Sequence, residues 1–67
     1  MDAVAIGKRL SELRGDKTQE TVAKDIGCSV SAIAMYERGE RIPRDEVKIA
    51  IAKYYGVSVQ SLFFATE

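Results

Sequence analysis

The sequence contains no histidine, one cysteine and one proline. Without histidine, the chain lacks the most versatile general base of proteins and their commonest metal ligand. It also has no glycine-rich phosphate loop, no cluster of metal-ligating residues and no nucleophile beside an activating base. We therefore expect no enzyme activity, no metal, no cofactor and no small-molecule ligand.

The single cysteine, Cys28, cannot form an internal disulfide. A free cysteine is more often a small buried apolar residue than a reactive group, and a chain without disulfides is typical of a reducing compartment. No apolar run is long enough to span a membrane, and the acidic Asp2 without an apolar segment after it argues against a signal peptide. The sequence predicts a cytoplasmic protein with no membrane partner.

An excess of one charge is also missing. Ten Lys and Arg residues balance ten Asp and Glu residues, whereas many DNA-binding domains are clearly basic. Net charge does not report how charges are distributed, however. Arg38, Arg41 and Arg44 follow one another closely, opposed within that stretch only by Glu40. A local basic region on a neutral protein is therefore expected.

The length of 67 residues allows one domain, residues 1–67, and no internal repeat, linker or low-complexity segment interrupts it. Met1 at the start and a predicted helix near the end favour a complete chain. A chain of this size buries only about 60% of its unfolded surface. Its stability is therefore expected to be marginal unless a second copy extends the core.

Five short helices are predicted from apolar residues that recur at helical spacing. The expected ranges are 3–14, 19–26, 30–37, 45–55 and 59–64. The inward stripes of the first and fourth helices are Ala3, Ile6, Leu10 and Leu13, and Val47, Ile51, Tyr54 and Tyr55. Capping hydroxyls precede three of the helices at Thr18, Ser29 and Ser58, and glycines follow three of them at Gly15, Gly27 and Gly56.

The segment 19–38 organises the chain, because it predicts two helices joined by a tight turn. An inward seam that locks the two helices is expected from Ala23, Ile26, Ile33 and Tyr36. The outer side of the second helix carries short, uncharged residues, which can enter a groove. An ordinary exposed helix surface is the alternative interpretation of that side.

This segment resembles the helix-turn-helix of the Cro and lambda-repressor-like (Xre-type) DNA-binding family. The matching residues are Gln19, Ala23, Gly27, Ile33 and Tyr36, followed by the loop 37–43 and by residues 55–58. The resemblance covers the chain from about Ile6 to Phe63. It implies an all-α, lambda-repressor-like bundle of about five short helices that forms a single helix-turn-helix DNA-binding domain.

The resemblance also implies base contacts from the second motif helix, through Val30, Ser31, Ala32 and Met35. Physical reasons agree, because a helix fits the major groove and short side chains near its N-terminus allow a close approach. The face lacks Arg, Gln and Asn, which make bidentate contacts to bases. We therefore expect much of the specificity to come from DNA shape and a few contacts to thymine methyl groups.

Phosphate contacts are expected from Thr18, Gln19, Ser29, Arg38, Arg41 and Arg44. Helix N-termini attract phosphate, and each arginine that neutralises a phosphate releases counterions. Two alternatives stay open: Thr18 and Ser29 can serve only as caps, and Arg38 can face Glu37 or Glu40 instead of DNA. The resemblance further implies an ion pair between Arg14 and Glu37.

An apolar dimer surface is predicted from Ile49, Phe63 and Phe64; alternatively, Phe63 completes the core and Phe64 packs along the terminus. The function predicted from the sequence is a sequence-specific regulator of transcription that binds double-stranded DNA. We expect a repressor that acts as a homodimer on a two-fold operator, because occupying a promoter needs no chemistry. The alternative is an antitoxin-like or adaptor module whose main partner is a protein.

Overall fold

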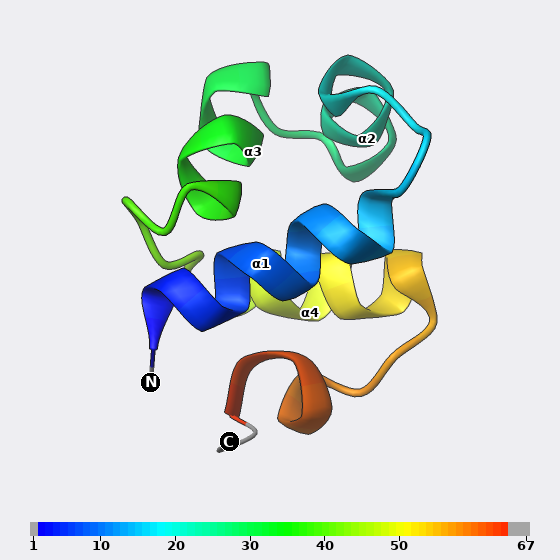
Figure 1. The fold of residues 1–67 in the computed structure, drawn as a ribbon. Helices are drawn as coiled ribbons and strands as arrows, with labels where there is room; N and C mark the ends of the chain where they lie inside the picture. Colours follow the sequence, from blue (N-terminus) through cyan, green and yellow to red (C-terminus); the bar gives the residue numbers. More distant parts are fainter. Residues whose placement is uncertain (1, 65–67) are drawn as a thin grey trace.

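The computed structural model describes residues 2–64, and within this range the chain forms five helices and no strand. The helices are α1 (Ala3–Arg14), α2 (Gln19–Ile26), α3 (Val30–Glu37), α4 (Asp45–Tyr55) and η1 (Gln60–Phe64). In Figure 1, α1 crosses the middle with α4 behind it, α2 and α3 lie at one end, and η1 lies at the other. The predicted all-α bundle of about five short helices is confirmed.

The helix ends follow local chemistry, which explains why their predicted ranges agree with the structure. The Thr18 hydroxyl accepts a hydrogen bond from the Thr21 N–H at 3.0 Å. The hydroxyls of Ser29 and Ser58 cap α3 and the last helix in the same way. The last turn is wider than an α-helix, and its π-helical part begins at Gln60, one residue after the predicted start.

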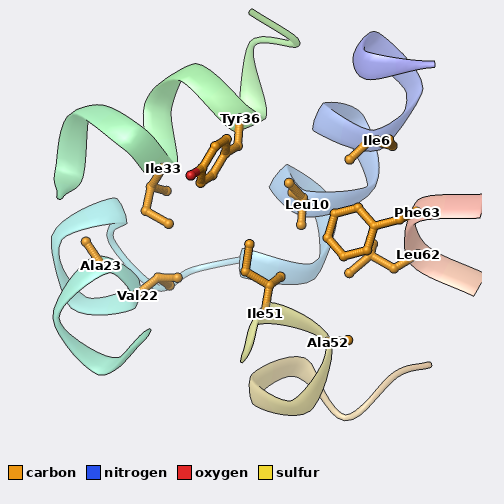
Figure 2. Packing of buried hydrophobic residues seen from close by; sticks show 10 residues of the cluster. All are labelled: Ile6, Leu10, Val22, Ala23, Ile33, Tyr36, Ile51, Ala52, Leu62 and Phe63. Carbon is orange, nitrogen blue, oxygen red and sulfur yellow. The ribbon is translucent and has the colours of Figure 1, made fainter. Parts of the chain in front are cut away.

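The core gathers side chains from all five helices (Figure 2). Its buried apolar members are Ile6 and Leu10 of α1, Val22 and Ala23 of α2, Ile33 and Tyr36 of α3, Ile51 and Ala52 of α4, and Leu62 and Phe63 of η1. Leu13, which was expected in the α1 stripe, is 38% exposed. Helix α3 packs against both α1 and α2, and α1 also contacts η1.

The buried side of α4 differs from its predicted stripe. Ile51 is buried as expected, but Val47, Tyr54 and Tyr55 are only partly buried, and Ala52 takes a full core position. Lys48 is also buried, with 8% of its surface exposed. Its ammonium lies 5.1 Å from the centre of the Phe64 ring and 3.6 Å from an Asp45 carboxylate oxygen. The lysine stem thus covers apolar surface while its charge keeps favourable neighbours.

Phe63 is a correction to the predicted dimer surface. Its side chain is only 1% exposed and belongs to the core, so it has no area to offer a partner. The two other predicted residues, Ile49 and Phe64, are 60% and 45% exposed. Phe63 therefore completes the core, as the alternative prediction had it, and Phe64 lies outside the core.

Candidate nucleic-acid interface

The α2–turn–α3 unit has the geometry that the sequence predicted. Gly27 ends α2 with φ of +91°, and the N–H groups of Gly27 and Cys28 both donate to the Ala23 carbonyl, at 2.8 and 2.9 Å. Cys28 is half-buried against the core, and burial raises the pKa of its thiol. The turn is therefore a rigid, packed corner that fixes α3 relative to α2.

The outer face of α3 presents three of the four predicted base-contacting residues. Val30 is 41% exposed, Ser31 is exposed, and Met35 is half-buried. Ala32 is different, because it packs against the core cluster. Ile33 and Tyr36 occupy the opposite side of the same helix and are buried. The face available to a ligand is thus small, uncharged and mostly apolar.

The start of α2 places the predicted phosphate ligands Thr18 and Gln19 together. The Thr18 hydroxyl caps the helix and donates to the Thr21 hydroxyl at 2.9 Å. The Gln19 amide nitrogen donates to Glu37 Oε1 at 3.0 Å, so its side chain is already oriented by a neighbour. One N–H of that amide is left for a further acceptor. Ser29 plays the capping role at the start of α3.

The ion pair between Arg14 and Glu37 is present, as the resemblance implied. Arg14 Nε lies 2.7 Å from Glu37 Oε2, and a second guanidinium nitrogen donates to Oε1 at 3.1 Å. The third nitrogen donates to the Lys17 carbonyl at 2.6 Å. The hydrogen bond to Glu37 raises the pKa of Arg14 above its ordinary value. One guanidinium therefore joins α1, the link to α2 and the end of α3.

The three arginines that are predicted to contact phosphates differ in their surroundings. Arg38 forms a two-point pair with Glu40, with Nε 2.6 Å from Oε2, and this pair lowers the pKa of the Glu40 carboxyl. Of the two partners that stayed open, Glu40 is therefore the one observed. Arg41 and Arg44 are exposed, and no residue in the described part of the chain pairs with either side chain.

One polar contact near this surface was not predicted. Lys17 donates to the Tyr54 hydroxyl at 2.9 Å, and that hydroxyl donates to an Asp25 carboxylate oxygen at 2.7 Å. The Lys17 ammonium also lies 4.7 Å from the centre of the Tyr54 ring, and the hydrogen bond raises its pKa. The contact joins α4 to the link before α2 and to Asp25 in the last turn of α2. Sequence spacing gave no signal for it, because it placed Tyr54 in a buried stripe.

Tyr55 lies close to the Arg14–Glu37 pair and titrates abnormally. Burial, followed by the negative charge of Glu37, raises the pKa of the Tyr55 phenol to about 12. In the unfolded chain a tyrosine ionises near pH 10. Between these two values the unfolded state loses its proton while the folded state keeps it.

We expect the free energy of unfolding to fall as the pH rises from about 10 to about 12, by at most about 1.4 kcal/mol per pH unit from Tyr55. Below pH 10 this contribution is fully present. Urea denaturation at a series of alkaline pH values measures it, and Tyr55→Phe is the control because it removes the ionisable group. If the free energy of unfolding of Tyr55→Phe falls over this pH range as much as that of the original protein, other residues cause the decline.

Two comparisons with known proteins agree with this geometry. A family model described as helix-turn-helix matches residues 8–62. An uncharacterised HTH-type transcriptional regulator of Methanocaldococcus jannaschii is 37% identical over 46 residues, which are 69% of this chain and 70% of that protein. No solved structure gives a significant match. Within residues 2–64, no helix is long and apolar enough to cross a membrane, and no group of acidic or cysteine side chains could hold a metal ion.

Proposed function

The chain belongs to the helix-turn-helix family, and from this premise we propose that it is a sequence-specific, double-stranded DNA-binding regulator of transcription. We further propose that it acts as a repressor, as a homodimer on a two-fold operator, with residues 1–67 working as one domain. The observation that carries the proposal is the exposed outer face of α3, with Val30 41% exposed and Ser31 exposed beside it.

In the proposed complex, α3 lies in the major groove with its N-terminal end toward the bases. Ser31 can donate to or accept from a base edge, and Val30 and Met35 can contact thymine methyl groups. Because this face has no side chain for bidentate readout, the deformability of the DNA supplies a large part of the specificity. Ala32 packs inward and contributes mainly by its small size.

Phosphates are proposed to lie against both ends of the motif. At the start of α2, free backbone N–H groups and the Gln19 amide face one strand. Ser29 adds its hydroxyl proton while it caps α3. The single proton of the Thr18 hydroxyl goes to the Thr21 hydroxyl and would have to turn toward the phosphate. Beyond the end of α3, Arg41 and Arg44 are exposed, and no described residue forms an ion pair with them. These two arginines are the principal source of electrostatic affinity.

Dimerisation is proposed to use the exposed apolar residues of α4 and η1. Ile49 and Phe64 line an open groove together with Val59, Lys48 and Asp45. Helix η1 lies at the opposite end of the molecule from α2 and α3 (Figure 1), so pairing there leaves both α3 faces free. Two such faces on a two-fold dimer meet half-sites about 34–36 Å apart.

The same apolar groove also supports the second candidate, an antitoxin-like or adaptor module with a protein partner. The two candidates differ in salt dependence, because DNA binding through arginine–phosphate contacts weakens steeply as salt rises. A tight, stoichiometric protein complex combined with weak, salt-insensitive DNA binding would favour the module.

The test is enrichment of random duplex DNA on the purified protein, repeated at several salt concentrations. We expect a two-fold symmetric sequence to be recovered and its affinity to fall with salt. The same selection with Ser31→Ala and Met35→Ala combined should recover an altered sequence, because it removes the proposed contacts to a base edge and to a thymine methyl group.

The matched control is Arg41→Ala combined with Arg44→Ala. Loss of phosphate contacts should weaken binding to all sequences alike and leave the recovered sequence unchanged. If the variant with changes at Ser31 and Met35 recovers the same DNA sequence as the original protein, α3 does not determine the sequence preference. If the variant with changes at Arg41 and Arg44 loses affinity for one sequence only, these two arginines do not act by contacting the DNA backbone.

A further inference from the structure

The turn that follows α3 is anchored more firmly than an ordinary surface loop. The Gly39 N–H donates to the Tyr36 carbonyl at 3.2 Å, and the Glu40 N–H donates to the Met35 carbonyl at 3.0 Å. This pair of bonds closes the helix end around a left-handed residue. Gly39 has φ of +75°, and a Cβ there would stand 2.9 Å from the Val4 Cα. The backbone of Glu40 is thus tied to the end of α3.

The anchored turn places Glu40 beside Arg38 with two contacts between them. Arg38 Nε lies 2.6 Å from Oε2, and a terminal guanidinium nitrogen lies 3.2 Å from Oε1. The two side chains are 58% and 53% exposed. Exposed ion pairs of this kind add little to folding stability. The main effect of the pair is therefore on the availability of the Arg38 guanidinium.

The neighbouring arginines show what the pair changes. Arg41 and Arg44 follow Arg38 within one loop and are exposed, and no described residue engages their side chains. Sequence-independent binding to DNA depends almost entirely on cationic side chains that contact phosphates. The N–H groups that Arg38 does not use for Glu40 could still reach a phosphate, but the carboxylate offsets its positive charge as long as the pair lasts. The Glu40 carboxylate would also repel a phosphate that lies against the loop.

On this basis we propose that Glu40 is a specificity-determining residue, which withholds Arg38 from DNA of arbitrary sequence. The proposal rests on the proposed function as a sequence-specific DNA-binding protein. In a loosely docked complex the phosphates occupy no fixed place, so the two-point pair persists. When α3 is seated at its operator, a phosphate is held beside the turn and Arg38 exchanges Glu40 for it.

The test compares Glu40→Gln with the original protein on two duplexes of equal length. One carries the sequence recovered by enrichment, and the other carries a scrambled version of it. We expect Glu40→Gln to bind the scrambled duplex about threefold more tightly, with a salt slope steeper by about 0.9, as for one added phosphate contact. Operator binding should change less, so the ratio of the two affinities should narrow.

Two controls separate release of Arg38 from a simple change in net charge. Glu12→Gln removes the same charge from exposed α1 surface, outside the arginine loop. It should leave the salt slope unchanged. Arg38→Gln combined with Glu40→Gln should cancel the gain on the scrambled duplex.

The possible failures are distinguishable. If the original protein recovers no sequence and binds no duplex in a salt-dependent way, the proposed function is wrong. If the original protein binds its operator but Glu40→Gln behaves like Glu12→Gln, the inference about Glu40 is wrong and the function stands. If Glu40→Gln tightens both duplexes equally, Arg38 is withheld from the operator as well, which also contradicts the inference.

Discussion

Replacement of Gly7 by alanine is expected to destabilise the protein by about 2–3 kcal/mol, near the upper end of the usual cost of overpacking. A Cβ at this position would stand 2.5 Å from the Glu37 carbonyl oxygen and 2.7 Å from the Tyr36 carbonyl oxygen. Both contacts are with backbone atoms at the end of α3, which cannot rotate away as a flexible side chain would. The helices must therefore separate.

The expected sign is the net result of two opposing effects. Gly7 lies inside α1, where alanine would ordinarily stabilise the helix by about 1 kcal/mol. Steric conflict at the α1–α3 crossing exceeds this gain. Urea denaturation measures the outcome, and Ser11→Ala on the exposed side of α1 is the control, with a small expected stabilisation. A Gly7→Ala variant as stable as the original protein would show that α3 can shift without cost.

Arg14→Ala is expected to lower the free energy of unfolding by about 2–4 kcal/mol, because it leaves the Glu37 carboxylate without its cationic partner. The Glu37 side chain is 7% exposed and would keep only the hydrogen bond from Gln19. The Arg14 side chain is 21% exposed, so the expected loss is below that of a fully buried pair. The Lys17 carbonyl would also lose a donor.

Two further variants make this prediction specific to the pair. Arg14→Lys keeps the charge but cannot reproduce three directed contacts, so we expect an intermediate loss. Arg14→Met combined with Glu37→Leu should cost less than the sum of its single changes, because it removes both charges together. Equilibrium denaturation of all variants completes the cycle. Strict additivity would mean that the two side chains do not act as a pair.

The helix ranges were predictable because their signals are local. Thr18 and Ser29 need only the N–H groups of the next turn, and Gly27 needs only its own backbone freedom. The inward seam was predictable for a similar reason, since helical spacing alone puts Ile33 and Tyr36 on one side. The signals for such features come from neighbours within a few residues.

The remaining features depend on how separate helices are placed. Burial of Lys48 depends on α4 and η1 meeting, because its ammonium lies 5.1 Å from the centre of the Phe64 ring. The Lys17–Tyr54 contact joins residues on different elements. Arg38 pairs with Glu40 and not with Glu37, which also depends on tertiary structure because Arg14 of α1 already binds Glu37. Spacing in the sequence carries no information about these choices.

The bond between Arg14 and the Lys17 carbonyl bears on how this protein tolerates changes in length. Surface connections usually accept insertions, since their backbone faces water. Here a guanidinium of α1 spans the link and holds its far end at 2.6 Å, while the same group holds α3. One residue added between Gly15 and Lys17 would move that carbonyl and turn the start of α2 away from the end of α3. The length of this short connection would therefore set the orientation of α2 relative to α3, and with it the orientation in which the protein can meet a duplex.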